Sequence, residues 1–222
     1  KDHLNHFAYE SHRRALAAIE AGHFQQEIMP VHITQEDGTV TIFEVDEGPR
    51  ADTTIERLKD LKTVFQEQGV ITAGNASQMS DGASAVVLMS LEKAQELGIQ
   101  PLAKIVTRVV VGSDPTLMLT GPIEATRQAL KRAGLTIEEI DTYEVNEAFA
   151  PVPLAWLHDI GADPAKLNPD GGAIALGHPL GATGTKLLTT MVYRMQRENL
   201  RYGLIAICEG MGMANATIIE KM

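Results

Sequence analysis

The segment that most constrains this chain is Gly171–Gly184, which reads GGAIALGHPLGATG. Glycine recurs along it, and His178 lies in its middle, directly before Pro179. Glycines this dense let the backbone approach a neighbour closely or adopt positive φ, at an entropic cost that a purely structural segment would avoid. The following residues have a helical pattern, so the loop leads into a helix amino end whose free N–H groups can face an anion or a carbonyl oxygen. We therefore predict a functional site around His178.

Composition limits the class of protein. The 222 residues can form one large domain or two small ones. A formal net charge of −10 argues against a surface for nucleic acid or anionic membranes, because phosphates need clustered Lys and Arg. There is no run of about eighteen apolar residues and no signal-peptide pattern, so we expect a soluble protein of the cytoplasm or of an organelle matrix.

No metal site is predicted. His3, His6 and His12 lie near one another on the first predicted helix, but no carboxylate or cysteine completes a ligand set, so we expect solvated histidines. The single cysteine, Cys208, excludes an internal disulfide and a multi-cysteine metal site. Taken alone, Cys208 is more often a buried core thiol than a reactive one.

Apolar spacing, capping residues and β-branched runs predict the order of helices and strands. The predicted helices cover 4–21, 55–68, 91–97, 121–133, 151–160 and 185–199. The predicted strands cover 28–34, 40–45, 83–89, 102–111, 141–145, 203–208 and 213–220. The first two strands form a hairpin across Asp37-Gly38. The later strand–helix alternation predicts a mixed α/β sheet covered by helices on both faces.

Two segments allow more than one interpretation. Residues 70–82 are small and polar, which suits either close contact with a ligand or a tight turn between two strands. The apolar run 83–89 after them suits a strand that is buried on both faces. Asn146 and Glu147 follow another predicted strand, where they act either as site residues or as helix caps.

Asn146, His178 and Cys208 carry chemically capable groups at strand ends or in glycine-rich loops. An amide can hold a water, a neutral imidazole can donate to an oxyanion, and a thiol can exchange a proton with a carbon acid. Their order and surroundings resemble the thiolase family, the acyl-CoA:acetyl-CoA acyltransferases. The resemblance covers essentially the whole chain and rests on TAGNAS with SDGA (72–83), TGPIEATRQAL (120–130), NEAFA (146–150), GGAIALGHPLGATG, the Cys208 hairpin, and the SHRRA and GHFQQEI segments.

The resemblance implies the thiolase fold, an α/β fold in which two similar halves with mixed five-stranded sheets stack as α/β/α/β/α layers. Residues 1–69 would be mainly the loop (cap) domain, 70–95 the last strands of the amino-terminal half, and 96–222 the carboxyl-terminal half. Thiolases associate as dimers or dimers of dimers. We therefore expect a homodimer or a homotetramer.

The resemblance also implies roles for single residues. His178 would help activate a nucleophilic cysteine and, with a water held by Asn146, stabilise the thioester oxygen. Cys208 would be the general acid/base for the acetyl-CoA carbanion, and the Gly210 backbone would donate to a second oxyanion hole. Coenzyme A and acyl-CoA would bind in an extended pose as substrates, with no permanently bound cofactor. The implied coenzyme A contacts are Ser77, Ala76, Phe65, Met118 and Arg50.

The family's nucleophilic cysteine lies in the amino-terminal half, and Cys208 is not that residue. We therefore expect this chain to be the carboxyl-terminal part of a thiolase, completed by a portion that carries the nucleophile. The expected activity is thiolytic cleavage of 3-ketoacyl-CoA to acyl-CoA and acetyl-CoA, or the reverse Claisen condensation, in fatty acid or lipid degradation by β-oxidation. The alternative is a non-catalytic thiolase-like subunit that binds acyl-CoA or lipid.

Three residues depart from the family's usual pattern. Glu209 stands where an aliphatic residue is frequent, and Met211 and Gln78 stand where glycine is common. They suggest an altered acyl pocket for bulky or ring-bearing chains, and for Glu209 a solvent-facing side chain is the alternative. The length of the acyl chain and the direction of the reaction stay open.

Overall fold

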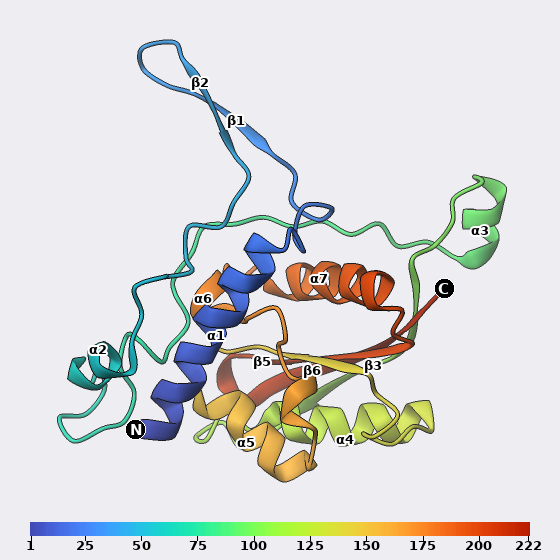
Figure 1. Ribbon diagram of the computed structural model, residues 1–222. Coiled ribbons are helices and arrows are strands. Elements are labelled where there is room, and N and C mark those ends of the chain that lie inside the picture. Colours follow the sequence, from blue (N-terminus) through green and yellow to red (C-terminus); the bar gives the residue numbers. More distant parts are fainter.

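The computed structural model describes all residues, 1–222, around a four-stranded mixed sheet (Figure 1). Its strands, in spatial order, are β3 (Ala103–Gly112), β6 (Met213–Lys221), β5 (Tyr202–Cys208) and β4 (Thr142–Val145). β6 runs antiparallel to both β3 and β5, whereas β4 and β5 are parallel. The parallel pair places the carboxyl ends of β4 and β5 at the same end of the sheet.

Helices cover both faces of this sheet, which confirms the predicted α/β layers (Figure 1). The helices are α1 (Asp2–Glu20), α2 (Ile55–Asp60), α3 (Leu91–Glu96), α4 (Gly121–Ala133), α5 (Pro151–Ile160), α6 (Ala173–Leu176), α7 (Thr183–Glu198) and the 3₁₀ helices η1 (Pro164–Lys166) and η2 (Gly210–Gly212). α4 and α5 cover one face, where Trp156 and Tyr143 are fully buried. α7 covers the other face through Met191 and Met195, and α1 packs on α6 beyond it. The core therefore has two layers of apolar contact, one on each side of the sheet.

Capping residues set the helix ends where the sequence indicated them. The hydroxyl of Thr54 accepts from the backbone N–H of residue 57, and Ser90 caps α3 in the same way. Gly134 and Gly161 end α4 and α5 with φ of 67° and 71°, a left-handed conformation that favours glycine. α2 is nevertheless shorter than predicted. The chain after it pairs with another loop, since the Val64 N–H donates to the carbonyl oxygen of residue 71 at 3.0 Å.

The predicted buried strand at 83–89 is wrong. Residues 77–90 form neither helix nor strand and run as an extended segment toward α3 (Figure 1). Val87 is 83% exposed and Leu88 is 65% exposed. A strand needs neighbouring strands to pair its backbone groups, and no other strand of this chain lies beside the segment. The segment is held instead by contacts such as the Ser84 hydroxyl, which donates to the carbonyl oxygen of Ala182 at 2.8 Å.

The sheet has four strands instead of the five expected for a thiolase half. The fifth position beside β4 is reduced to a single bridge, between Tyr143 and Leu167. Before Leu167 the chain forms η1, and after it Asn168 has a φ of 43° and precedes a proline. Because proline has no N–H and the left-handed residue turns the chain, the extended backbone cannot continue.

A hairpin projects from the body of the molecule (Figure 1). Its strands, β1 (Val31–Thr34) and β2 (Val40–Phe43), are antiparallel, and Gly38 in the turn has a φ of 83°. The Asp37-Gly38 turn prediction is therefore confirmed. The hairpin exposes the apolar side chains of Val31, Ile33, Val40, Ile42 and Phe43. None of the helices combines the length and apolar character needed to cross a bilayer.

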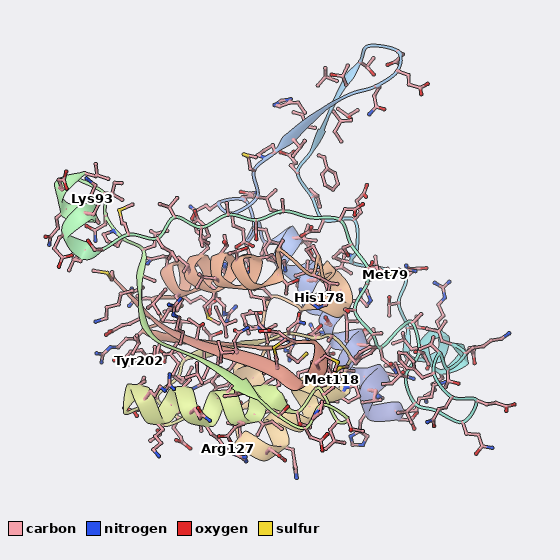
Figure 2. All side chains as sticks on the ribbon, turned by 180° about the vertical axis from the view of Figure 1, so that it is seen from behind. Met79, Lys93, Met118, Arg127, His178 and Tyr202 are labelled. Carbon is pink, nitrogen blue, oxygen red and sulfur yellow. The ribbon has the colours of Figure 1, made fainter.

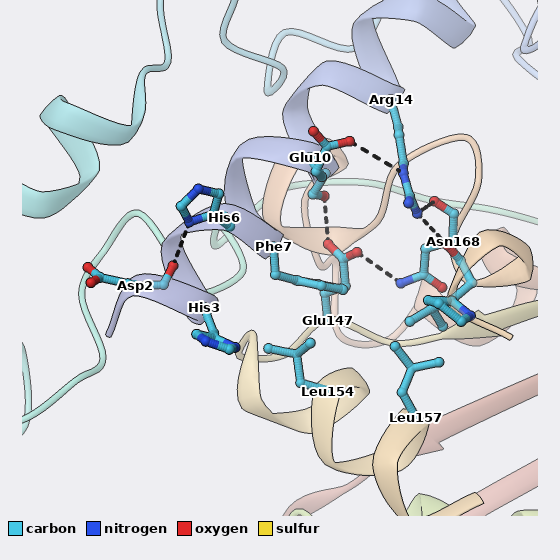
Figure 3. Close-up of a pocket in the computed structure, with 13 residues that line it drawn as sticks. Asp2, His3, His6, Phe7, Glu10, Arg14, Glu147, Leu154, Leu157 and Asn168 are labelled. Atoms are coloured by element: carbon cyan, nitrogen blue, oxygen red, sulfur yellow. Dashed lines mark hydrogen bonds and ion pairs between the residues drawn. The ribbon is translucent and has the colours of Figure 1, made fainter. Parts of the chain in front are cut away.

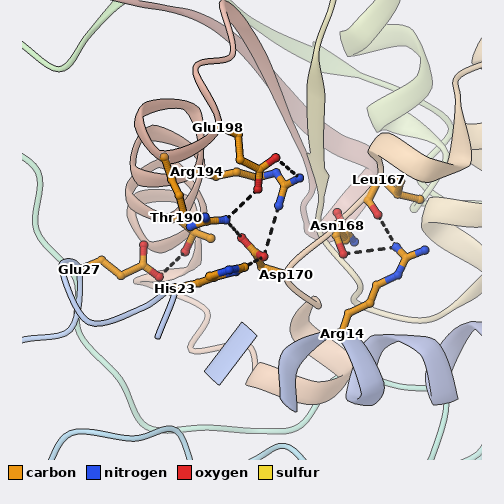
Figure 4. A network of polar contacts seen from close by, with 10 residues as sticks. Arg14, His23, Glu27, Leu167, Asn168, Asp170, Thr190, Arg194 and Glu198 are labelled. Carbon is orange, nitrogen blue, oxygen red and sulfur yellow. Dashed lines mark hydrogen bonds and ion pairs between the residues drawn. The ribbon is translucent and has the colours of Figure 1, made fainter. Parts of the chain in front are cut away.

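A buried ion cluster joins α7 to the start of the glycine-rich segment (Figure 4). The side chain of Asp170 is 3% exposed, and its Oδ1 accepts from His23 Nδ1 at 2.9 Å and from Arg194 Nη1 at 3.3 Å. Its Oδ2 accepts from Arg197 Nη2 at 2.8 Å. Burial by itself would raise the pKa of Asp170, but these hydrogen bonds and the arginine charges bring it below the ordinary value.

Asp170→Asn is expected to lower the free energy of unfolding by about 2 kcal/mol at pH 7, because two arginines lose their carboxylate. The pKa of Asp170 is depressed in the folded state, so its contribution is present above the unfolded pKa of about 4 and is lost as pH falls through the folded pKa. Urea unfolding from pH 7 down to the lowest pH at which both proteins fold should show the difference shrinking. A difference that is the same at every pH would contradict this account of the cluster.

Candidate active site

The parallel strands β4 and β5 bring Asn146 and Cys208 to the same end of the sheet. Val145 pairs with Ala206, and the Asn146 N–H donates to the Ala206 carbonyl oxygen at 3.0 Å. Asn146 thus follows β4 directly, and Cys208 ends β5 two residues beyond that pair. Both side chains are buried. The sequence correctly placed polar groups at the carboxyl ends of buried strands.

The glycine-rich segment carries His178 toward Asn146. α6 ends at Gly177, whose φ of 87° favours glycine, and a Cβ there would overlap the Ser80 side chain. The His178 N–H donates to the carbonyl oxygen of Gln78 at 3.1 Å. The extended segment 77–90 therefore supports the loop that carries His178.

Hydrogen bonds fix the orientation of the His178 ring (labelled in Figure 2). The Thr183 hydroxyl donates to the Pro179 carbonyl oxygen at 2.9 Å, so it accepts from His178 Nδ1, which lies 2.6 Å away. A proton on Nδ1 makes Nε2 an acceptor, and the amide Nδ2 of Asn146 lies 3.3 Å from it. Asn146 Oδ1 is buried and has no hydrogen-bond partner in the protein. It is available to accept from a water or a substrate group.

Burial sets the protonation of both titratable side chains. It lowers the pKa of His178, so the imidazole is neutral at pH 7. Burial also raises the pKa of the Cys208 thiol to about 11, and the Glu209 carboxylate adds to the rise. The site therefore contains a neutral imidazole whose unprotonated Nε2 faces the Asn146 amide, and a thiol that keeps its proton at neutral pH.

The turn after Cys208 contains η2, whose first residue is Gly210, the predicted backbone donor. Met211 has a φ of 61° and Gly212 a φ of 81°, so the turn is tightly bent. The Ser113 N–H donates to the Gly212 carbonyl oxygen at 2.7 Å, which holds the turn against the end of β3.

Three of the predicted coenzyme A contacts meet at the NEAFA segment. The Ser77 N–H donates to the Ala148 carbonyl oxygen at 3.0 Å, and Ala76 forms a β-bridge with Phe149. Phe65 packs edge-on against Phe149, with ring centroids 5.8 Å apart, and is 70% exposed. These contacts leave an exposed aromatic side chain next to backbone from residues 76 and 77.

The other two predicted coenzyme A contacts lie in separate segments. The Arg50 N–H donates to His12 Nδ1 at 3.1 Å, and the Arg50 side chain is exposed. His12 is itself buried, so the expectation of a solvated helix-face histidine is wrong for this residue. Met118 has a φ of 57° and lies in the loop after β3, where its N–H donates to Asp114. Figure 2 shows Met118 toward the same end of the sheet as His178.

The three departures from the family pattern differ in their surroundings. The amide of Gln78 donates to three backbone carbonyls, two of them in the glycine-rich segment. Glu209 is half-buried and accepts from Asn215 Nδ2 at 2.7 Å, so it does not simply face solvent. Met211 is 75% exposed. Of the three, Met211 is the side chain free to contact a ligand.

Sequence reasoning missed two residues that orient the site. Thr183 binds the His178 ring from the first turn of α7. The signal that could have identified it is a hydroxyl residue at the start of the predicted helix, five residues after the histidine. Asn168 clamps β4, since its amide accepts from the Val145 N–H and donates to the Val145 carbonyl oxygen, both at 2.9 Å. No local pattern reveals this contact, because it joins a loop to a strand.

Two family models match the chain. The model described as "Thiolase, N-terminal domain" matches residues 1–92, and "Thiolase, C-terminal domain" matches residues 99–221. A steroid 3-ketoacyl-CoA thiolase of Mycobacterium tuberculosis is 53% identical over 222 residues, which cover 100% of this chain and 53% of that protein. An acetyl-CoA acetyltransferase of Pseudomonas aeruginosa is 46% identical over 215 residues, covering 97% of this chain and 55% of that protein. The chain thus spans about half the length of the curated relatives it matches.

Comparison with solved structures gives the same family. The acetyl-CoA acetyltransferase of Bacillus anthracis superimposes with a TM-score of 0.96 at 41% identity, over 100% of this chain and 56% of that one. Human mitochondrial 3-ketoacyl-CoA thiolase gives a TM-score of 0.93 at 38% identity, with the same coverage. The predicted thiolase fold is therefore confirmed, and the chain belongs to the thiolase family.

Proposed function

We propose that this chain supplies the acid/base and oxyanion-hole groups of a thiolase. The reaction is thiolytic cleavage of 3-ketoacyl-CoA to acyl-CoA and acetyl-CoA, or the reverse Claisen condensation. The contact between His178 and Asn146 carries the proposal, because it lies at the strand ends that also hold Cys208. The relatives named 3-ketoacyl-CoA thiolase and acetyl-CoA acetyltransferase support the same class of reaction.

In the first half of the reaction, a cysteine outside this chain adds to the 3-keto carbon of the substrate. His178 Nε2, which is unprotonated, takes the proton of that thiol. The carbon–carbon bond between C2 and C3 then breaks, the carbonyl re-forms as an enzyme thioester, and the electron pair moves to C2. The Cys208 thiol gives its proton to C2 and acetyl-CoA leaves.

In the second half, the thiol of coenzyme A attacks the acyl thioester. The Cys208 thiolate left by the first half takes the proton of the incoming thiol. Protonated His178 returns its proton to the departing nucleophilic cysteine, so both cysteines and His178 return to their starting states. Acyl-CoA leaves. The buried setting of Cys208 favours its protonated form before each turnover, which suits a general acid.

Two groups of donors would stabilise the oxygen that becomes negative. The buried, unpaired Oδ1 of Asn146 supports the proposal that a water bridges this amide and the thioester oxygen, beside His178. The Gly210 backbone N–H would serve the second oxyanion hole. Donors held rigidly by packed strands and turns are most effective, because they need no reorganisation as charge develops.

Coenzyme A would run from this site past Ser77, Ala76 and Phe65. The exposed ring of Phe65 supports contact with the apolar pantetheine arm. Met118 would line the channel and Arg50 would face the nucleotide end. We propose a ring-bearing or otherwise bulky acyl group, which the steroid 3-ketoacyl-CoA thiolase among the relatives supports, with Met211 as its contact.

The missing nucleophile is assigned to an amino-terminal thiolase portion that packs on this chain. The exposed apolar side chains of residues 87 and 88 support such a covering partner. Within this proposal residues 1–69 form the loop domain, 70–95 belong to the amino-terminal half and 96–222 form the carboxyl-terminal half. The exposed apolar hairpin β1–β2 supports association into a homodimer or homotetramer, which sedimentation can measure.

The test is an assay of the chain together with the amino-terminal portion. Coenzyme A-dependent cleavage of acetoacetyl-CoA, of longer 3-ketoacyl-CoAs and of a ring-bearing one should proceed with free acetyl-CoA as a product. Folded protein with no turnover on any of them would overturn the proposal. Binding of acyl-CoA without turnover would identify a non-catalytic acyl-CoA-binding subunit instead.

A further inference from the structure

Glu147 is a buried carboxyl group that the proposed reaction does not use. It directly follows Asn146 and is 1% exposed. Figure 3 shows it between α1 and the loop that contains Asn168, at the edge of a cavity of about 490 Å³. Neither His178 nor Cys208 lines this cavity. Glu147 therefore lies on the side of Asn146 that faces α1.

Three donors from three different segments surround the carboxyl group. Its Oε1 accepts from Asn168 Nδ2 at 2.9 Å. Its Oε2 accepts from the Ser11 hydroxyl at 2.7 Å and from the Ile174 N–H at 3.1 Å. Burial raises the pKa of Glu147, and the hydrogen bonds from Asn168 and Ser11 oppose the rise. Both oxygens thus act as acceptors, from an amide N–H, a hydroxyl and a backbone N–H.

The same carboxyl group packs tightly against the glycine-rich segment. A Cβ at Gly172 would overlap the carboxyl carbon of Glu147, so a larger residue there would displace the carboxyl group. The Gly172 N–H donates to Ser11 Oγ at 3.1 Å, which extends the network from α1 into the loop. Ile174 lies in α6, the short helix that ends two residues before His178.

We propose that Glu147 is a positioning residue that sets the His178 loop against Asn146 by joining α1, Asn168 and α6. The proposal rests on the function proposed above, in which His178 and Asn146 act on the same oxygen. Because the backbone of Glu147 is continuous with Asn146 and its side chain binds the loop of His178, one residue determines the distance between the two groups. A displacement of about 1 Å at such a pair can lower a rate about 100-fold.

Glu147→Gln tests this with almost no change in size. The Asn168 amide cannot turn to help, because its Oδ1 and Nδ2 both bind Val145. A glutamine NH₂ would then face the N–H of Asn168 in one orientation and the N–H of Ile174 in the other. Either orientation places a donor against a donor, which moves the loop.

The matched control is Glu144→Gln. Glu144 lies three residues earlier and is also buried. Its Oε1 has no hydrogen-bond partner, so the substitution there breaks no hydrogen bond to that oxygen. The pKa of Glu144 is raised to about 8 by burial, so it is mostly protonated at pH 7 and glutamine resembles it closely. Glu144→Gln should keep kcat within about twofold of the parent. If the protein tolerated no substitution of a buried carboxyl group, kcat would fall in both Glu144→Gln and Glu147→Gln.

The experiment uses the chain with its amino-terminal portion and two measurements. In steady-state cleavage of acetoacetyl-CoA, Glu147→Gln should lower kcat about 100-fold and change KM less than about threefold, because ground-state binding does not use the displaced pair. In protein labelled with ¹³C-histidine, the His178 ring resonance, assigned with His178→Gln, should shift in Glu147→Gln and stay unchanged in Glu144→Gln.

Ser11→Ala serves if Glu147→Gln does not fold, since it removes one donor to Glu147 and the acceptor of the Gly172 N–H. It should lower kcat about tenfold and shift the same resonance. An unshifted His178 resonance with kcat within twofold of the parent, in whichever variant folds, would overturn the positioning role. If the parent itself has no turnover, the proposed function fails, and the resonance alone decides whether Glu147 positions His178.

Discussion

Cys208→Ala is expected to abolish both thiolytic cleavage and Claisen condensation while leaving the fold intact. Without the thiol, no group at the end of β5 can give a proton to C2 of the departing acetyl-CoA or remove one in the reverse direction. General acid/base groups typically contribute about 100- to 10,000-fold, so kcat should fall at least about 1,000-fold. The fold should persist because the backbone register of residue 208 with Ala214 does not depend on the side chain.

The measurement for Cys208→Ala combines kinetics with proton exchange. Acetyl-CoA incubated with the parent in D₂O should exchange its α-protons, and the variant should not exchange them. Cys208→Ser is the control for shape, since a hydroxyl of similar size is a much poorer acid, and it should be nearly as inactive. The circular dichroism spectrum should match that of the parent, and the free energy of unfolding in urea should differ by no more than about 1 kcal/mol. Retained activity in Cys208→Ala would show that another residue is the acid/base.

Glu144→Gln is expected to make the protein more stable than the parent at high pH and equally stable at low pH. Glu144 lies on β4 with its side chain buried and its Oε1 unpaired. Burial raises its pKa from 4.5 to about 8, with the charges of Asp170 and Glu147 adding to the rise and Lys186 opposing it. The folded protein therefore favours the protonated carboxyl group.

The direction of this pH dependence follows from the raised pKa. Below pH 4.5 the carboxyl group is protonated in both the folded and the unfolded protein, so it adds no pH dependence. Between about 4.5 and 8 the unfolded chain ionises while the folded one does not, and each pH unit lowers the stability of the parent by about 1.4 kcal/mol. Above the folded pKa both states are ionised and the loss is constant. The full loss has an upper bound of about 5 kcal/mol.

Urea unfolding of the parent and of Glu144→Gln between pH 5 and pH 9 measures this effect. The difference in unfolding free energy should grow in favour of the variant by several kcal/mol across that range, and the slope should end near pH 8. Glu27, whose pKa burial raises to about 7, titrates in both proteins and cancels in the difference. Two parallel pH curves would show that Glu144 is ionised in the folded protein and finds a partner there.

Local sequence signals predicted most of the fold. The predicted start at 91 and the predicted ends at 133 and 160 match the structure, because the cap Ser90 and the glycines Gly134 and Gly161 act through nearby residues alone. The strand prediction at 83–89 failed because a buried strand needs partners, and an apolar pattern does not reveal whether this chain contains them. Local pattern likewise could not show that residues after α2 pair with a distant loop.

In the candidate site, too, local signals were informative and contacts between distant segments were not predictable. Asn146 and Cys208 could be placed together because the carboxyl ends of parallel strands meet, and the glycine-rich setting pointed to His178. The residues that orient them, such as Asn168, make contacts across the fold, and no periodicity encodes those contacts. The resemblance to the thiolase family supplied roles, and the structure supplied distances and protonation.

We propose that this chain provides the acid/base half of a thiolase site whose nucleophile lies elsewhere. The most direct measurement is acetyl transfer from [¹⁴C]acetyl-CoA to the chain and the amino-terminal portion, followed by peptide mapping of the labelled cysteine. We predict label on a cysteine of the amino-terminal portion that is lost after His178→Ala. After Cys208→Ala the label should still form, but more slowly, because coenzyme A must then leave as a thiolate without a proton from residue 208. Label on Cys208, or no label on folded protein that contains both parts, would contradict this division of roles between the two portions.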